Sequence, residues 1–313
     1  MLVVVALGGN ALLRPGDPRT VDRQRANVRV AAGALAPVLR DHDVVLTHGN
    51  GPQVGELARV AAAAGESAPP LDVLDAETEG LVGYLLAQEL RNAVPERELV
   101  TLLTQVVVDA ADPAFARPDK PIGAWYDESA ARAVAHDYGW TMTENAGRWR
   151  RVVPSPLPQS IVELRAVRTV LAAGIVPIAV GGGGIPVVVA PDGRTRGVDA
   201  VVDKDRTAAL LAQELGADRL ALLTDVDGVY LGWGTGEAQR IALAHPDALA
   251  AHGFAAGSMG PKVEAAVAFA RGGGTAVIGA LDDAARVVTG ATGTGDSAGT
   301  TVTTAAPGIT IVR

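Results

Sequence analysis

The chain has 313 residues, with 27 Lys or Arg against 35 Asp or Glu, a net charge of −8 and 48% hydrophobic residues. This length suffices for one large domain or two lobes, and the composition is that of a globular protein. A net negative charge argues against a nucleic-acid partner, which would need a concentrated basic face. Because the sequence contains no cysteine, disulfides and thiolate chemistry are excluded.

The sequence also lacks the features of a membrane or secreted protein. No apolar run approaches the ~18 residues that a membrane span needs. The apolar run at 2–7 is too short for a secretory signal and has no basic leader. We therefore expect a cytoplasmic protein with no membrane partner.

The predicted elements alternate in type along the chain. Short β-branched runs predict strands at 2–7, 43–47, 99–109, 174–180, 219–224 and 274–279. Longer segments rich in Ala and Leu predict helices at 20–40, 52–64, 71–93, 203–215 and 260–271. Strands that alternate with helices of this length are typical of parallel βαβ crossovers. We therefore expect an α/β fold with a mostly parallel sheet that helices cover on both faces.

Residues 110–158 interrupt this alternation. The segment is rich in Pro, Asp, Arg and aromatic residues, and it contains three of the four tryptophans, Trp125, Trp140 and Trp149. A linker seldom carries so much aromatic surface that needs burial. We therefore predict an inserted subdomain or flap, after which the proline-rich residues 154–158 return the chain to the α/β core.

Glycine-rich segments follow three of the predicted strands, at 8–10, 49–55 and 181–184. In open parallel sheets, ligands bind beyond the carboxyl ends of the strands. Glycine there lets the backbone approach a phosphate, and N–H groups at the start of the next helix can hold the anion. Each loop taken alone is more simply a tight turn between a strand and a helix. Three such loops in one chain favour an anion-binding site.

Lysine is rare in this chain, because arginine supplies nearly all other positive charge; the three lysines are Lys120, Lys204 and Lys262. A lysine is a compact cation on a flexible stem, whereas arginine is a planar fork. Lys204 lies between Asp203 and Asp205 at the start of a predicted helix, where Asp203 can be the N-cap or can orient Lys204. We interpret Lys204 and Lys262 as candidate site residues. Lys120 taken alone could equally be a surface lysine with no functional role.

Two further segments could contact a nucleotide. One follows a predicted strand and offers Asp225, Asp227 and Tyr230 to a nucleoside, although an ordinary Asp-x-Asp-Gly turn explains the same pattern. The other is 257–262, where a proline in the first helical turn would aim free N–H groups and the following lysine at one anion.

Other signatures are absent or incomplete. The chain has no G-x-x-x-x-G-K-[ST] loop and no H-R-D or D-F-G of protein kinases. Its glycines in 49–55 are spaced one residue too far for the dinucleotide fingerprint, so an NAD-binding dehydrogenase is a weak alternative. The G-x-S-x-G pattern at 295–299 has no following long helix and no later histidine, which excludes a hydrolase elbow. The histidines show no zinc spacing, and His48 could contact a ligand or make a local hydrogen bond.

Several segments, taken in order, resemble those of a known family. They are 6–12 (ALGGNAL), 48–55 (HGNGPQVG), 112–115 (DPAF), 120–123 (KPIG), 149–156 (WRRVVPSP), 181–186 (GGGGIP), 203–205 (DKD), 223–227 (LTDVD) and 257–262 (GSMGPK). With these motifs the chain from Val4 onward resembles the amino-acid-kinase superfamily and, within it, the carbamate kinases. Many relatives have a lysine in the first motif, where this chain has Ala6-Leu7-Gly8. In carbamate kinases a lysine of the protruding subdomain serves instead, and Lys120 lies in that segment.

The resemblance implies a three-layer αβα sandwich, usually a homodimer, and the reversible reaction ATP + carbamate ⇌ ADP + carbamoyl phosphate. It implies one domain over 1–313, with an N-terminal lobe over about 1–175 that includes a protruding subdomain over about 110–158, and a C-terminal lobe over about 176–313. The first lobe would bind carbamate or carbamoyl phosphate. The second would bind ATP or ADP, with Mg²⁺ held mainly by the nucleotide phosphates and no metal ligands from the protein. Many members make ATP during arginine breakdown, and we expect this direction here.

The resemblance also assigns roles to residues of this chain. The expected catalytic residues are Lys120, Lys204, Lys262 and Asp205. The expected substrate-binding residues are Gly8, Gly9, Asn10, Gly49, Asn50, Gly51, Gly181 and Gly182. The expected nucleotide-binding residues are Lys204, Asp225, Asp227, Tyr230, Gly257, Ser258, Met259, Gly260 and Lys262. We expect N–H groups of Gly8, Gly9, Gly49 and Gly51 to hold the transferring group, and Asp205 to organise the lysines.

Two alternatives stay open beside this expectation. A kinase of the same superfamily could act on another carboxylate or on a phosphonate. A catalytically silent nucleotide sensor would have lost a lysine or a glycine loop, whereas this sequence keeps all of them. Trp125, where phenylalanine is common, and Trp233, in the loop beyond Tyr230, depart from the family pattern; the second could change contacts with adenine.

Overall fold

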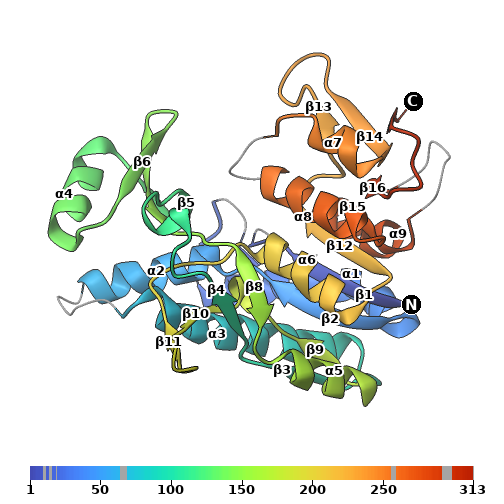
Figure 1. Cartoon of the computed structure of the whole chain (residues 1–313), viewed down its shortest axis with the longest axis horizontal. Coiled ribbons are helices and arrows are strands. Elements are labelled where there is room, and N and C mark those ends of the chain that lie inside the picture. The colour runs from blue at the N-terminus through green and yellow to red at the C-terminus, as the bar shows by residue number, and fades with distance from the viewer. Residues whose placement is uncertain are drawn as a thin grey trace.

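A large, mostly parallel sheet runs through the centre of the computed structural model (Figure 1). The structure describes residues 1–9, 12–13, 16–18, 20–63, 69–254, 259–290 and 298–312. The strands of this sheet are β1 (Leu2–Leu7), β2 (Asp43–His48), β3 (Leu99–Thr101), β9 (Val176–Ile178), β12 (Arg219–Thr224), β13 (Tyr230–Leu231), β14 (Gln239–Ala244), β15 (Thr275–Ala280), β16 (Thr300–Val302) and β17 (Ile309–Ile311). Their order is β13-β14-β16-β15-β12-β1-β2-β9-β3, with β17 beside β14. Parallel pairing joins the central strands from β15 to β3.

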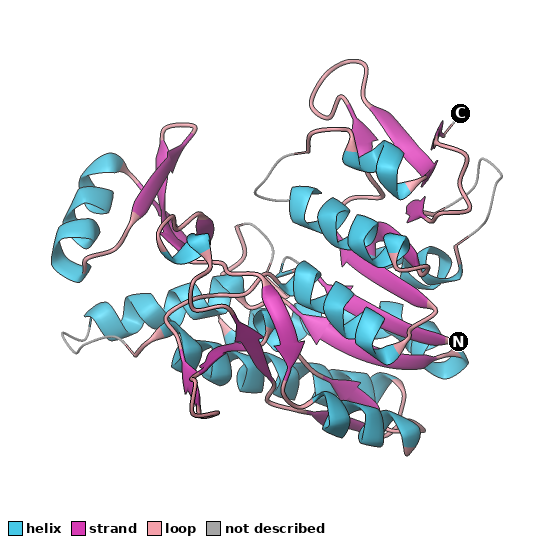
Figure 2. Ribbon diagram, viewed as in Figure 1, coloured by secondary structure: helices cyan, strands magenta, loops and turns pink. Residues whose placement is uncertain are grey.

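Helices cover both faces of this sheet (Figure 2). The helices of the described residues are α1 (Val21–Asp41), α2 (Gly51–Ala63), α3 (Leu71–Ala93), α4 (Glu128–Tyr138), α5 (Leu164–Ala172), α6 (Lys204–Leu215), α7 (Pro246–Ala250), α8 (Met259–Arg271) and α9 (Ala284–Thr289). Successive side chains of a strand point to opposite faces. Val3 and Val5 of β1 therefore pack in the cluster with α1, α3 and α9, whereas Val4 and Ala6 pack in the cluster with α6 and α8. This three-layer αβα arrangement confirms the expected fold class.

The strand predicted at 99–109 is in fact two strands in two sheets. β3 ends at Thr101, and the next strand, β4 (Gln105–Val108), belongs to a four-stranded sheet with β8 (Pro158–Ile161), β10 (Ile185–Val189) and β11 (Thr195–Gly197). The hydroxyl of Thr104 marks the break, because it donates to the Leu102 carbonyl (2.9 Å) and accepts the N–H of Val180 (3.1 Å). Such side-chain bonding to the backbone competes with the strand ladder.

The strand predicted at 174–180 is also shorter than expected. Its strand β9 ends at Ile178, and Val180 has a left-handed φ of 47° where the chain enters the glycine loop. β9 lies between β2 and β3, so the first strand beyond the predicted lobe boundary at residue 175 joins N-terminal strands. The division into two lobes remains a prediction.

The interrupting segment forms a separate sheet that projects from the body (Figure 1). Its strands are β5 (Lys120–Tyr126), β6 (Met142–Asn145) and β7 (Arg148–Val153), accompanied by α4. It contacts α2 where a Cβ on Gly55 would lie 2.0 Å from Gly123 Cα, an approach that requires glycine. Trp125 is 40% exposed and lies beside the guanidinium groups of Arg148 and Arg150. Part of this aromatic surface is therefore exposed, whereas we expected it to be buried.

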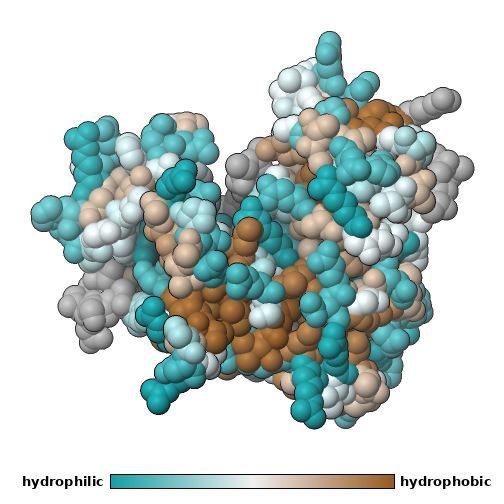
Figure 3. Space-filling view, viewed as in Figure 1, coloured by the Kyte–Doolittle hydropathy of each residue, from teal (hydrophilic) through white to brown (hydrophobic). Residues whose placement is uncertain are grey.

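The space-filling view shows the molecule hollowed between the protruding sheet and the C-terminal elements (Figure 3). A band of hydrophobic surface lies below this hollow, over the four-stranded sheet. Exposed large hydrophobic side chains in or beside the strands of that sheet are Leu103, Leu157, Val162 and Val189. Among the helices of the described residues, none is both long enough and apolar enough to cross a membrane.

Candidate active site

A cavity of about 1730 Å³ lies between the protruding sheet, the carboxyl ends of β1, β2 and β12, and the starts of α6 and α8. The predicted site residues that line it are Gly8, Gly9, Gly49, Asn50, Gly51, Lys120, Gly182, Lys204, Asp205, Asp225, Tyr230, Met259 and Lys262. Those that do not line it are Gly181, Asp227 and Gly260. Asn10, Gly257 and Ser258 lie outside the described residues.

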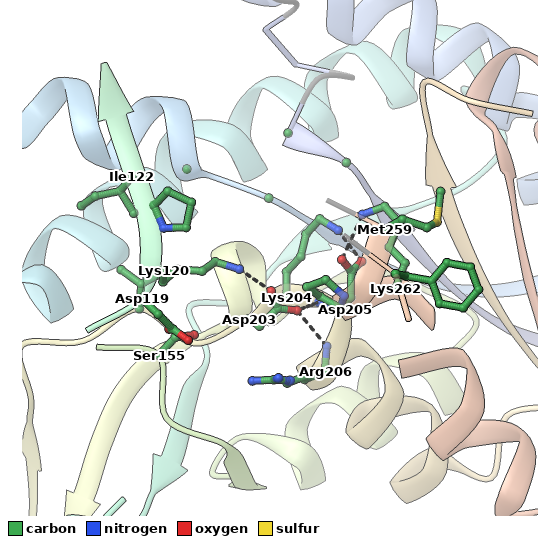
Figure 4. A pocket seen from close by; sticks show the side chains of 18 of the residues that line it. Asp119, Lys120, Ile122, Ser155, Asp203, Lys204, Asp205, Arg206, Met259 and Lys262 are labelled. Atoms are coloured by element: carbon green, nitrogen blue, oxygen red, sulfur yellow. Dashed lines mark hydrogen bonds and ion pairs between the residues drawn. The ribbon is translucent and has the colours of Figure 1, made fainter. Parts of the chain in front are cut away.

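The ammonium groups of the three lysines meet two carboxylates of one short segment (Figure 4). Lys262 Nζ lies 3.0 Å from Asp205 Oδ2, and Lys204 Nζ binds Asp205 Oδ1. Lys120 Nζ, from β5, binds Asp203 Oδ2. The side chain of Lys120 is 29% exposed, against 10% for Lys204 and 11% for Lys262. Three lysines that are far apart in the sequence therefore share one cavity.

The first turn of α6 explains this geometry. Asp203 is the N-cap, because its Oδ1 accepts the N–H groups of Asp205 (2.9 Å) and Arg206 (3.2 Å). Its other oxygen, Oδ2, holds Lys120. The interpretation of Asp203 as the N-cap is therefore confirmed, whereas the alternative that it orients Lys204 is wrong, because its free oxygen binds Lys120. Lys204 is oriented by Asp205 instead.

Burial and the shared carboxylate determine the charges in the cavity. Burial lowers the pKa of Lys204 to about 8, although Asp205 opposes this shift. Burial by itself would raise the pKa of Asp205, but the two neighbouring ammonium groups outweigh it and hold that pKa below its usual range. For Lys262, the attraction of Asp205 outweighs burial and raises the pKa. Near neutral pH, Asp205 is therefore a carboxylate between two cations, of which Lys204 loses its proton first.

Two of the glycine N–H groups that we expected to hold the transferring group are already bonded. The N–H of Gly8 donates to the Leu223 carbonyl and that of Gly49 to the Leu7 carbonyl, each at 3.0 Å. Both bonds extend the parallel sheet by one residue beyond the strand ends. The prediction that these two N–H groups bind an anion is therefore wrong, because sheet pairing uses the donors.

The neighbouring glycines differ in this respect. In the part of the chain that the structure describes, no hydrogen bond uses the N–H of Gly9 or Gly51, and Gly51 opens α2, where the first N–H groups have no partner within the helix. Gly49 has a steric role instead. A Cβ at this position would lie 3.2 Å from Lys204 Cδ, so the glycine leaves room for the lysine stem.

A buried carboxyl group below the Gly181–Gly183 turn was missed by the sequence analysis. Glu79 of α3 accepts the N–H of Gly181 at 2.8 Å and the N–H of Thr104 at 3.1 Å. Burial raises the pKa of Glu79 to about 8, although these two N–H groups oppose the shift. A Cβ on Gly181 would lie 2.4 Å from His48 Nε2. Gly181 therefore supports the cavity from below and does not face it.

The sequence is compatible with two roles for His48, a contact with the ligand or a local hydrogen bond. Its side chain is buried and does not line the cavity, and its Nδ1 lies 3.2 Å from the carbonyl oxygen of Gly49. Burial lowers the pKa of His48 to about 4, so its ring is neutral near pH 7. The geometry supports the local interaction.

Aromatic residues line the C-terminal end of the cavity. The rings of Tyr230 and Trp233 meet edge to face with their centroids 5.1 Å apart, and Trp233 is 67% exposed. Asp227 lies behind them: its Oδ1 accepts the Tyr230 hydroxyl at 2.8 Å, and its Oδ2 lies 3.4 Å from Arg240 Nε. Asp227 therefore holds the aromatic wall in place, whereas Asp225 lines the cavity itself.

The donor set of the cavity suits phosphate oxygens. Buried ammonium groups and backbone N–H groups are the partners that phosphates prefer in proteins. Across the described ranges, no group of three or more His, Cys, Asp or Glu side chains is arranged to hold a metal ion. The donor set of the cavity therefore fits an anion such as a phosphate group.

Comparison with known proteins agrees with this geometry. The sequence model of the amino acid kinase family matches residues 1–279. A carbamate kinase from Haemophilus influenzae is 48% identical, over 94% of this chain and 96% of its own length. One from Pyrococcus horikoshii is 45% identical, over 93% of this chain and 98% of its own. Among solved structures, carbamate kinase from Giardia lamblia bound to AMP-PNP has a TM-score of 0.84 at 36% identity, covering 96% of this chain and 98% of that one. By these similarities and by its fold, the chain belongs to the amino acid kinase family, as a relative of carbamate kinases.

Proposed function

We propose that the protein is a carbamate kinase, which transfers the γ-phosphoryl group of ATP to carbamate and, in reverse, makes ATP from carbamoyl phosphate and ADP. The observation that carries this proposal is the pair of buried lysines on Asp205, with Lys120 beside them in the same cavity. The similarity to carbamate kinases over nearly the whole chain supports it further.

Phosphoryl transfer needs position and charge more than it needs covalent help from the protein. In the forward direction, a carbamate oxygen forms a bond to the γ-phosphorus while the bond from that phosphorus to the bridging oxygen of ADP breaks. The attacking oxygen is already anionic, so no general base is required. The balance of atoms and charge is complete without proton transfer.

Lys204 and Lys262 would stabilise the negative charge of the transferring group. An ammonium group has three N–H donors, and each of these two lysines directs one at Asp205. Donors therefore remain for phosphate oxygens, while Asp205 keeps two cations close together that would otherwise repel. Lys120 would contact the group from the side of the protruding sheet. Enzymes commonly gain more rate enhancement from such electrostatic stabilisation than from any other single effect.

The nucleotide would occupy the C-terminal end of the cavity. Tyr230 and Trp233 offer an aromatic wall for the base, and Asp225 and Met259 line the same end. Lys262 at the start of α8 faces the terminal phosphates in this arrangement. Mg²⁺ would arrive with the nucleotide, held mainly by its phosphates, and would neutralise part of their charge.

The remaining parts of the proposal follow from the family resemblance. We propose a homodimer, ATP synthesis from carbamoyl phosphate in arginine catabolism, and a cytoplasmic location. The band of hydrophobic surface over the four-stranded sheet is one that a second copy could cover. The mass of the purified protein by light scattering tests the dimer.

The activity is tested with purified protein, carbamoyl phosphate, ADP and Mg²⁺, with ATP measured by a luciferase reaction. We expect ATP to form at a rate proportional to enzyme concentration, and Lys204→Ala to lower that rate about 10²-fold or more. The control variant is Arg132→Ala, on the exposed face of α4, which should form ATP at the rate of the parent protein. Absence of ATP with carbamoyl phosphate, together with turnover of another carboxylate or a phosphonate, would assign a different kinase activity.

A further inference from the structure

Asn50 occupies a position where its side chain has an unusual set of partners. Its carbonyl oxygen accepts the N–H groups of Gln53 (2.8 Å) and Val54 (2.9 Å), so Asn50 is the N-cap of α2. An asparagine at this position ordinarily turns its side chain onto the N–H groups of the first helical turn. Here the side-chain amide instead donates to two residues of α3, Asp75 Oδ1 and Thr78 Oγ1, each at 2.9 Å.

The orientation of this amide is fixed by Thr78. The hydroxyl of Thr78 donates to the Leu74 carbonyl at 2.8 Å, one turn back on the same helix. A hydroxyl has a single proton, so Thr78 Oγ1 can only accept from Asn50, and the atom facing it must be the Nδ2 nitrogen. The assignment of nitrogen and oxygen in this amide therefore rests on the hydrogen-bond network.

Both protons of Nδ2 are thus used inside the protein, which leaves the oxygen Oδ1 for the cavity. Asn50 is 2% exposed and lines the cavity, and no hydrogen bond within the described residues uses its Oδ1. Gly182 packs over the amide, because a Cβ on this glycine would lie 2.3 Å from Nδ2 and 2.8 Å from Oδ1. The amide cannot turn its plane without moving this loop, so the site presents a fixed acceptor.

The cavity lining also contains carboxylates, of which Asp203 and Asp205 are paired with the lysines, whereas Asn50 Oδ1 has no partner among the described residues. A carboxylate or phosphate oxygen placed against Oδ1 would be repelled. Carbamate and carbamoyl phosphate carry an NH₂ group, which donates, whereas acetate and acetyl phosphate carry a methyl group in its place. Asn50 Oδ1 can accept a hydrogen bond from this NH₂ group and gains nothing from the methyl group.

We propose that Asn50 Oδ1 is the specificity determinant that accepts a hydrogen bond from the amino group of carbamate and carbamoyl phosphate. Asp75 and Thr78 are positioning residues that hold both amide protons and so keep the oxygen toward the substrate. This inference rests on the proposed function and assigns the acceptor-substrate selectivity of the same site. A site built to bond a substrate N–H rejects an analogue without one, because its own polar group is left unpaired.

Acetyl phosphate is the probe for this inference, because a methyl group replaces the amino group at nearly the same size. The rate of ATP formation from ADP is measured with carbamoyl phosphate and with acetyl phosphate, and the ratio of the two kcat/KM values is the readout. We expect Asn50→Ala to lower this ratio at least about tenfold, mainly through the loss of activity with carbamoyl phosphate.

Thr78→Val tests the positioning role without touching the substrate. It removes one anchor of the amide, and we expect the ratio to fall about fivefold. The matched control is Thr169→Val on α5, since Thr169 Oγ1 makes the same kind of bond, 2.9 Å to the carbonyl one turn back, on an exposed surface. This variant should keep the parental ratio.

The outcomes separate this inference from the proposed function. If the parent makes no ATP from carbamoyl phosphate, the proposed function fails. If the parent is active but Asn50→Ala and Thr78→Val lower both activities equally, Asn50 is only structural and the inference is overturned. A parental ratio near one would overturn it as well. Should Asn50→Ala fail to fold, the result with Thr78→Val decides.

Discussion

Replacing Lys204 with arginine keeps the positive charge and changes only its shape, which makes it a sharp test of the lysine cluster. The stem of Lys204 passes under Gly49, with 3.2 Å between Cδ and the Cβ position of that glycine, and its side chain is 10% exposed. A guanidinium group is larger and would engage Asp205 through two parallel hydrogen bonds. Overpacking of this kind lowers the free energy of unfolding by about 1–3 kcal/mol.

The expected effect on catalysis is larger than the effect on stability. A guanidinium that is bidentate on Asp205 lies off the position of the ammonium, and a displacement of about 1 Å in an active site can lower the rate about 10²-fold. We therefore expect Lys204→Arg to lower kcat for ATP formation from carbamoyl phosphate and ADP about 10²-fold.

The control is the same substitution at the most exposed lysine. Lys120 is 29% exposed and binds a single carboxylate, so Lys120→Arg has room and should lose less activity than Lys204→Arg. Urea denaturation of both variants shows whether the fold is intact. A kcat for Lys204→Arg within twofold of the parent would refute the role given to the ammonium group.

Three further predictions concern stability and pH. Asp205→Asn removes the carboxylate that both buried ammonium groups bind, and we expect the free energy of unfolding in urea to fall by about 3 kcal/mol and to be partly recovered by added ADP. An unchanged urea midpoint would contradict this prediction. Gly55→Ala forces a Cβ to within 2.0 Å of Gly123 Cα, and should lower the free energy of unfolding by about 1–3 kcal/mol, with Gly51→Ala, which meets no neighbour, as the milder comparison. Because the pKa of Lys204 is lowered to about 8, kcat/KM should fall as pH rises through that value. Between pH 8 and 10.5, Lys204 binds more protons in the unfolded chain than in the folded one, so its contribution to the free energy of unfolding should increase with pH while activity declines. A flat pH–rate profile up to pH 10 would contradict a catalytic role of the charged Lys204.

The central elements of the fold are predictable from the sequence because their signals are local. β1, β12 and α3 have the bounds that their apolar runs and helical periodicity predict. The short strands β10, β11, β13, β14, β16 and β17 were not predicted. Four of them, β11, β13, β16 and β17, have only two or three residues, which is too short for a periodic pattern to be recognised in the sequence.

The candidate site was predictable where residue type itself carries chemistry. Rare lysines and glycine clusters mark the cavity. The sequence does not distinguish Gly8 and Gly49, whose N–H groups pair within the sheet, from their neighbours Gly9 and Gly51. The network below the site was missed, yet α3 carries a signal for it. Asp75, Thr78 and Glu79 recur at helical spacing on the buried face that also holds Leu74 and Val82. Polar residues at buried positions of a helix need partners, and here the partners are a cavity residue and a glycine loop.

Asp203 divides its two oxygens between two elements, because Oδ1 accepts from the α6 backbone and Oδ2 binds Lys120 of the protruding sheet. The same sheet packs on α2, where Gly123 meets Gly55, so the position of Lys120 depends on how the sheet is seated on the core. Lys204 and Lys262, in contrast, both bind Asp205 and depend on α6 and α8 alone. A change in the seating of the protruding sheet would therefore alter one side of the cavity and leave the paired lysines in place.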